Sequence, residues 1–110
     1  MRIPNAENAV VEAEKLRDYL LSPNHPIGKF KSAFFRSVGY QAEEYHQLAA
    51  DFLGLLVGEA EQGIGNKFGE TYVVKGVLKG PNGRSAPVVT VWIILAGQSI
   101  PRFVTAYPEH

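Results

Sequence analysis

The sequence of 110 residues contains no cysteine, and this absence removes several classes of chemistry. Without thiols the chain cannot form a disulfide bond, use a cysteine nucleophile or hold a metal through thiolates. Its three histidines are scattered, with neither HxH nor HExxH spacing, so no transition-metal site is predicted. We therefore expect no metal and no cofactor, and any chemistry must come from His, Lys, Arg and hydroxyl groups.

The sequence also lacks a net charge and a long hydrophobic run. Eleven Lys and Arg residues balance eleven Asp and Glu residues, which argues against a uniformly basic coat for nucleic acid. The longest nearly apolar stretch, residues 86–97, is too short to cross a bilayer as a helix. Residues 1–8 contain no apolar segment of the kind found in secretory signals. We expect a cytoplasmic protein that does not enter a membrane.

The remaining composition is that of a globular protein, with 45% hydrophobic and 20% charged residues. A single domain spanning residues 1–110 is expected at this length. In the first half of the chain the apolar residues recur with the spacing of a helix, and in the second half they alternate with period two, as in a strand. The sequence Gly-Pro-Asn-Gly at 80–83 marks a turn. The pattern predicts an α+β fold, with three N-terminal helices packed on a three-stranded antiparallel β-meander. The helices are expected over residues 12–21, 26–38 and 41–57, and the strands over 67–79, 85–95 and 100–107.

Lys31 has an unusual position on the second predicted helix. It lies within the apolar stripe formed by Ile27, Phe30, Phe34 and Val38. Burying an unpaired ammonium is costly, so two interpretations stay open. Either the aliphatic stem packs while the amine reaches solvent, or Lys31 lines a cleft between helix and sheet. In a cleft it would bind an anion or stabilise developing negative charge.

His25 precedes this helix and is a candidate acid or base, because imidazole titrates near neutral pH. The alternative is a loop histidine that hydrogen-bonds a backbone carbonyl. In the last predicted strand, Thr105 and Tyr107 are two residues apart and therefore project to the same side. They would hold a phosphate or orient an attacking hydroxyl, although Thr and Tyr are also ordinary strand formers.

Two arginines are candidate phosphate contacts. Arg84 directly follows the Gly-Pro-Asn-Gly turn, where a solvated loop charge is the alternative. Arg102 lies in the last strand, and regular alternation places it on the face opposite Thr105.

The acidic residues are distributed unevenly, since residues 23–42 and 71–108 contain none. If the second helix packs beside the meander, these two basic segments merge into a local cleft suited to a phosphate-bearing ligand. The alternative is that the basic side chains are solvated on separate faces.

Three segments carry a resemblance to known proteins: AENAVVEAEKLRDYLLSPNHPIGKFKSAFFRSVGY, GPNGRSAPVVTVWIIL and PRFVTAYP. Together they resemble a family of short bacterial domains of unknown function, over nearly the whole chain. Members of that family occur alone and as C-terminal modules of larger toxin-like, phage-head-like or secreted proteins.

More distantly, the order of helices, meander and a final strand ending in VTAYP is similar to the barnase, colicin D and RelE-like superfamily of ribonuclease toxins. This resemblance implies RNA cleavage without a metal. It also implies that His25 and Lys31 are the catalytic groups on the helix side, and Thr105 and Tyr107 those on the final strand.

Two functions follow as hypotheses. The first is a metal-independent ribonuclease-like toxin module, with RNA as substrate and an immunity protein as partner. In it His25 acts as acid or base, Lys31 and Arg102 stabilise the phosphorane, and Thr105 or Tyr107 positions it. The second is a non-enzymatic protein-binding or assembly domain, with the exposed side of the central strand around Trp92 as its interface. The oligomeric state is left open.

Overall fold

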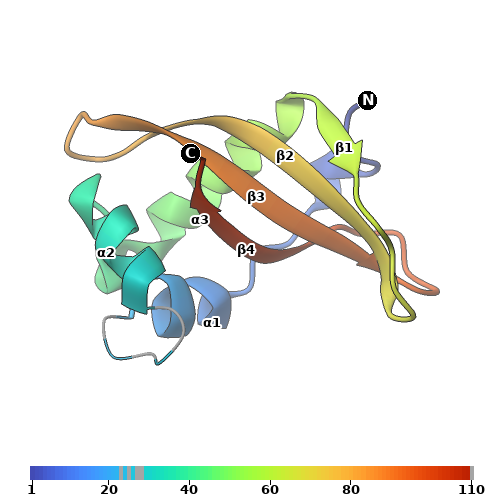
Figure 1. Cartoon of the computed structure of the whole chain (residues 1–110), viewed down its shortest axis with the longest axis horizontal. Coiled ribbons are helices and arrows are strands. Elements are labelled where there is room, and N and C mark those ends of the chain that lie inside the picture. Colours follow the sequence, from blue (N-terminus) through green and yellow to red (C-terminus); the bar gives the residue numbers. More distant parts are fainter. Residues whose placement is uncertain (23, 25, 27–28, 110) are drawn as a thin grey trace.

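The structure is a computed structural model that describes residues 1–22, 24, 26 and 29–109. Its helical segments precede the sheet along the chain (Figure 1). They are η1 (Ala6–Asn8), α1 (Ala13–Lys15), η2 (Leu16–Leu20), α2 (Lys29–Ser37), η3 (Ala42–Glu44), α3 (Tyr45–Gly54) and η4 (Leu55–Val57). The strands are β1 (Ala60–Gln62), β2 (Gly69–Lys79), β3 (Ser85–Leu95) and β4 (Arg102–Pro108).

The sheet has four strands in the order β1-β2-β3-β4, and every neighbouring pair is antiparallel. The three long strands confirm the predicted meander, but the prediction of a three-stranded sheet was wrong. The additional strand β1 has only three residues, which is too short for an alternating pattern to be recognised. It follows η4 after a short connection and pairs with the middle of β2.

The prediction of three N-terminal helices was also wrong. The two helices with more than two α-turns, α2 and α3, lie mid-chain. The segment expected to be the first helix contains one turn of α1, which continues directly into the π-helical turn η2. The predicted helix over residues 41–57 is divided into η3, α3 and η4. Glu44, the last residue of η3, leaves helical geometry with φ −109° and ψ 28°, and α3 begins after it.

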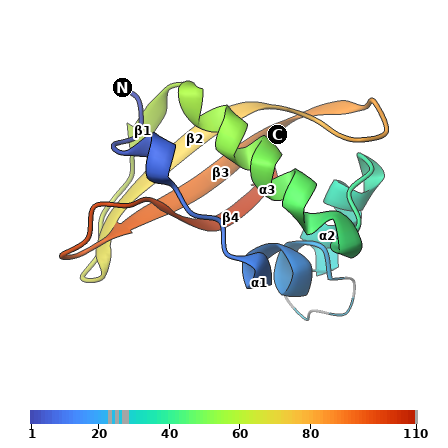
Figure 2. The same ribbon diagram turned by 180° about the vertical axis from the view of Figure 1, so that it is seen from behind.

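A chain of aromatic rings connects the helices to the sheet. Helix α3 lies across one face of the sheet (Figure 2). The ring of Phe52 from α3 is 5.8 Å from that of Phe35 in α2 and 5.0 Å from that of Phe103 in β4. Phe103 in turn lies 5.4 Å from Trp92 in β3. Each of these side chains is at most 2% exposed, and burying one contributes about 1.5–3 kcal/mol.

Trp92 belongs to this core, so it cannot form the exposed interface that the second hypothesis placed at the central strand. Its indole N–H donates to the hydroxyl of Thr90 at 2.8 Å. That hydroxyl donates to the carbonyl of Val74, also at 2.8 Å. The buried polar groups of Trp92 and Thr90 are thus satisfied inside the sheet layer.

A β-bulge changes which residues of β4 share a face. Thr105 pairs with Val91 and Phe103 pairs with Trp92, so Val104 is an extra residue on β4. Phe103 and Ala106 consequently both face the core. The partners of Arg102, Thr105 and Tyr107 are Ile93, Val91 and Val89, which alternate along β3. These three β4 residues therefore share the opposite face, and the prediction that Arg102 opposes Thr105 was wrong.

The hairpin between β2 and β3 contacts the C-terminal end of α2. The side chain of Asn82 donates to the carbonyl of Ser37 at 3.0 Å. Gly39 has φ +105°, as expected for a glycine that follows a helix C-cap. At Gly80 the approach is so close that a Cβ would lie 1.8 Å from the carbonyl oxygen of Val38. Among the described residues, no helix is long and apolar enough to cross a membrane.

This close approach predicts that Gly80→Ala lowers the free energy of unfolding by about 1–3 kcal/mol, because the methyl group overlaps a backbone carbonyl. Gly54→Ala is the matched control, since nothing lies within 4 Å of its Cβ position in α3. Alanine there is expected to raise the same free energy by up to about 1 kcal/mol. Urea unfolding measures both, and equal stability of Gly80→Ala and wild type would contradict the docking of this hairpin.

Candidate functional site

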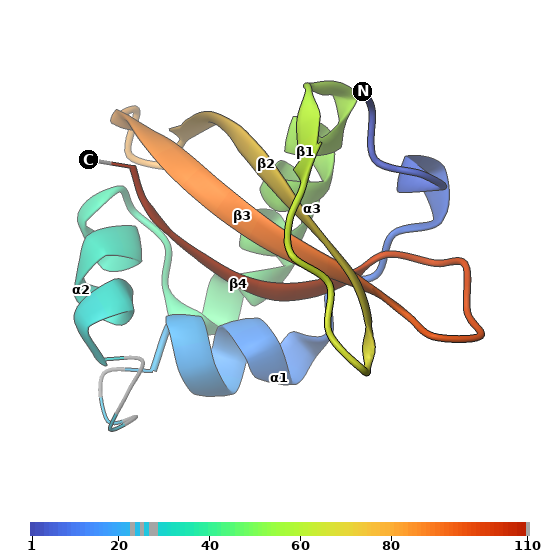
Figure 3. The same ribbon diagram turned by 45° about the vertical axis from the view of Figure 1, so that its right-hand side comes forward.

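A pocket of about 550 Å³ lies where the continuous helical segment α1–η2 meets α2 and β4. Figure 3 shows α1 and α2 side by side along the β4 edge of the sheet. The lining residues come from all three elements: Glu14, Lys15, Tyr19, Lys31, Val104 and Thr105. Residues far apart in the sequence therefore form one concave site.

The ammonium of Lys31 is held by two hydroxyl groups. Its Nζ donates to the hydroxyl of Tyr19 at 3.0 Å and to that of Thr105 at 2.9 Å. It also lies 5.3 Å from the centre of the Tyr19 ring and 6.0 Å from that of Tyr107. Such cation–π contacts favour a cation at this position.

The Lys31 side chain has no acidic partner in the part of the chain that the structure describes. An ammonium has three N–H donors, and two of them are directed at Tyr19 and Thr105. Among the described residues, no hydrogen bond from the third N–H is found. The half-buried Lys31 lines this pocket, as the second of the two interpretations given above would require.

Two local irregularities direct the hydroxyl groups at Lys31. In η2 the N–H of Leu21 donates to the carbonyl of Leu16 at 2.8 Å, which is an i to i+5 bond and widens the turn. Leu16, Leu20 and Leu21 are fully buried and anchor this turn, while Tyr19 lies at its edge. On the other side, the bulge places Thr105 toward the pocket.

The pKa of Tyr19 is lowered from its ordinary value. The main cause is the hydrogen bond from the Lys31 ammonium, which stabilises the phenolate. Burial opposes this effect, whereas the charges of Lys31 and Lys15 and a hydrogen bond with Thr105 support it. The pocket therefore favours a negative charge at the Tyr19 oxygen.

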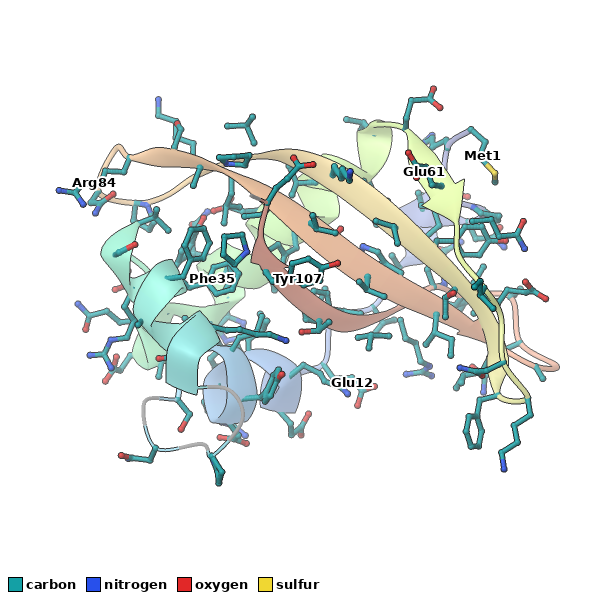
Figure 4. All side chains as sticks on the ribbon, viewed as in Figure 1. Met1, Glu12, Phe35, Glu61, Arg84 and Tyr107 are labelled. Carbon is teal, nitrogen blue, oxygen red and sulfur yellow. The ribbon has the colours of Figure 1, made fainter. Side chains whose placement is uncertain are left out.

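The predicted residues meet only in part at this pocket. Lys31 and Thr105 are in direct contact, and Tyr107 lies beside them, 39% exposed. His25 lies outside the described residues, so its predicted role stays a prediction. Arg84 lies at the tip of the β2–β3 hairpin, away from Tyr107 (Figure 4).

The predicted basic cleft contains fewer unpaired basic side chains than the two segments without acidic residues, 23–42 and 71–108, suggested. Helix α2 does pack beside β4, which was the condition for the segments to merge. Arg102, however, is 3.5 Å from Glu12, and Lys75 is 3.1 Å from Glu109. The acidic residues of neighbouring elements thus neutralise part of the charge, and Lys31 and Lys15 are the basic side chains that line the pocket.

Sequence reasoning missed Tyr19 as a site residue. It belongs to no recognised motif, and twelve residues separate it from Lys31. One signal was available, because Tyr19 is three residues from Leu16 and therefore borders the apolar face of the first predicted helix.

The chain belongs to the family described as Domain of unknown function (DUF6883), whose match spans residues 2–110. The predicted resemblance to a family of unknown function is thereby confirmed. A comparison with curated proteins found no significant match.

A similar solved structure is a chain from a "Contact-dependent growth inhibition toxin - immunity protein complex" of Klebsiella pneumoniae 342. The two chains share 19% identity with a TM-score of 0.69, over 92% of this chain and 100% of the other. At this identity the likeness establishes a common fold. The family and this fold place the chain among domains of unknown function with the architecture of a protein from a toxin–immunity complex.

The electrostatics of the pocket can be measured without a substrate. In an ultraviolet titration of tyrosinate, one tyrosine of the wild type is expected to ionise below the usual value of about 10. This early step should vanish in Tyr19→Phe and move upward in Lys31→Met, which lacks the ammonium. Tyr40 ionises late, because burial and the carboxylate of Asp51 raise its pKa.

An early ionisation that survives in Tyr19→Phe would contradict this assignment. Unchanged circular dichroism of both variants is the control for folding.

Proposed function

We propose that the domain is a metal-independent ribonuclease-like toxin module that cleaves RNA by transesterification. The observation that carries the proposal is the Lys31 ammonium, which is fixed by Tyr19 and Thr105 in a pocket and lacks a carboxylate partner among the described residues. A preorganised cation of this kind stabilises the negative charge that develops on a phosphate in the transition state.

In the proposed reaction, a ribose 2′-hydroxyl attacks the adjacent phosphorus and the bond to the 5′-oxygen breaks. The products are a 2′,3′-cyclic phosphate and a 5′-hydroxyl end. Lys31 contacts a phosphate oxygen through its third N–H and stabilises the phosphorane. Thr105 fixes the position of the ammonium, and Tyr107 presents an accessible ring beside it. His25 keeps its predicted role as an acid or base.

Arg102 has a more distant role in this proposal. It faces the same side as Thr105 but does not line the pocket, and Glu12 and Gln98 lie 3.5 Å from its guanidinium. It would contact a neighbouring phosphate of the RNA rather than the phosphorane. The similar structure comes from a complex that contains an immunity protein, and by analogy we propose an immunity protein as the partner.

The second candidate is a non-enzymatic assembly domain, which the outer face of the sheet favours. Val77 is 64% exposed there, and Val73, Val91 and Ile93 are only half-buried. The interface would thus lie on the face opposite Trp92. Light scattering at several concentrations distinguishes the two candidates, since a stable oligomer in which this face is covered favours assembly.

The nuclease proposal is tested by incubating the purified protein with several RNAs in the presence of EDTA. Wild type is expected to cleave, and Lys31→Ala to cleave at least about 100-fold more slowly, as when a preorganised donor to a developing anion is removed. Lys79→Ala is the matched control, because Lys79 is exposed on β2 and does not line the pocket. It should retain the wild-type rate.

His25→Ala is assayed alongside these variants, since that residue is the other predicted acid or base. Absence of cleavage by folded wild-type protein on all RNAs would contradict the proposal. Equal rates for Lys31→Ala and Lys79→Ala would also contradict it.

A further inference from the structure

Tyr19 and Lys31 form a pair whose contact is suited to proton exchange. The phenol oxygen and the ammonium nitrogen are 3.0 Å apart, and both residues line the same pocket. A proton can therefore move directly between them without an intervening water. The pair is fixed from two sides, by the buried leucines of η2 and by the hydrogen bond from Lys31 to Thr105.

We propose that Tyr19 is the general base and Lys31 the general acid of RNA cleavage, and that the contact between them restores both groups after each turnover. This inference rests on the proposed function.

The proton balance of the cycle closes. In the reactive state Tyr19 is a phenolate and Lys31 is an ammonium. The phenolate oxygen accepts the proton of the 2′-hydroxyl while the 2′-oxygen forms its bond to phosphorus. The bond from phosphorus to the 5′-oxygen breaks, and this oxygen takes a proton from the Lys31 ammonium. The neutral Tyr19 hydroxyl then passes its proton to the neutral Lys31 amine, which regenerates the phenolate and the ammonium.

The surroundings of Tyr19 support the phenolate form. From α2 it faces the Lys31 ammonium, and from β4 the Thr105 hydroxyl. From α1, Lys15 and Glu14 also line the pocket with opposite charges. The ring centre of Tyr107 in β4 lies 6.0 Å from the Lys31 nitrogen. The lowered pKa of Tyr19 agrees with this arrangement.

A tyrosine base and a histidine base differ in pH dependence, and this difference tests the proposal on the wild-type protein. If Tyr19 is the base, the cleavage rate should rise about tenfold per pH unit from about pH 6 to the lowered pKa of Tyr19. If His25 is the base, the rate should level off above about pH 6.5–7, where imidazole is already neutral.

The matching variant is Tyr19→Phe, which removes the oxygen and keeps the ring. Cleavage should fall at least about 100-fold, and the remaining activity should lose its rise with pH. Tyr45→Phe is the control, because Tyr45 is also half-buried but lies against Arg17 and His46, outside the pocket. Its rate and its pH profile should match the wild type.

The possible results separate this inference from the function on which it rests. The proton relay between Tyr19 and Lys31 is overturned if the wild-type cleavage rate levels off near neutral pH. It is also overturned if Tyr19→Phe keeps the wild-type rate and pH profile. In both cases the nuclease proposal stands. Complete absence of cleavage by wild type overturns the nuclease proposal, and the relay with it. A rising profile that is lost in Tyr19→Phe and kept in Tyr45→Phe supports the relay.

Discussion

The contact of Phe52 with Phe35 and Phe103 is the interaction on which the candidate site depends. Lys31 lies one turn before Phe35 on the same face of α2, and Thr105 follows Phe103 on β4 after one residue. Phe52 of α3 contacts Phe35 of α2 edge to face and stacks on Phe103 of β4, and these contacts set the distance across which the ammonium reaches the hydroxyl. The core thus supplies the preorganisation that a charged group in a partly buried pocket requires.

The two hydroxyls that hold Lys31 come from irregular segments. A π-helical turn and a β-bulge each insert one residue relative to the regular element. Both irregularities lie directly at the pocket, and both are flanked by fully buried side chains, Leu16 and Leu20 on one side and Ala106 on the other. With regular alternation, Phe103 and Ala106 could not both face the core while Thr105 points away from it.

These insertions also explain how much the sequence could predict. The long strands β2 and β3 were predictable, because their periodicity and the turn between them are strong local signals. The position of Lys31 within an apolar stripe singled out a residue that lines the pocket, while its role there stays a prediction. Tyr19 was missed and the face of Arg102 was predicted wrongly, because a helical wheel and a strict alternation both assume that no residue is inserted. Strand β1 was missed for a different reason, since its pairing with β2 is visible only in three dimensions.

The bulge at Val104 has a consequence for sequence variation within the family. Val104 is the unpaired residue of β4, so its side chain can change without altering the pairing of the strands on either side. Its deletion would instead reverse the faces of every residue on one side of it. Related chains are therefore expected to have different residues at position 104. They should conserve the number of residues between Phe103 and Ala106. An insertion or deletion there would prevent Phe103 and Ala106 from facing the core while Thr105 faces the pocket. A substitution of Val104 changes only the surface of the pocket.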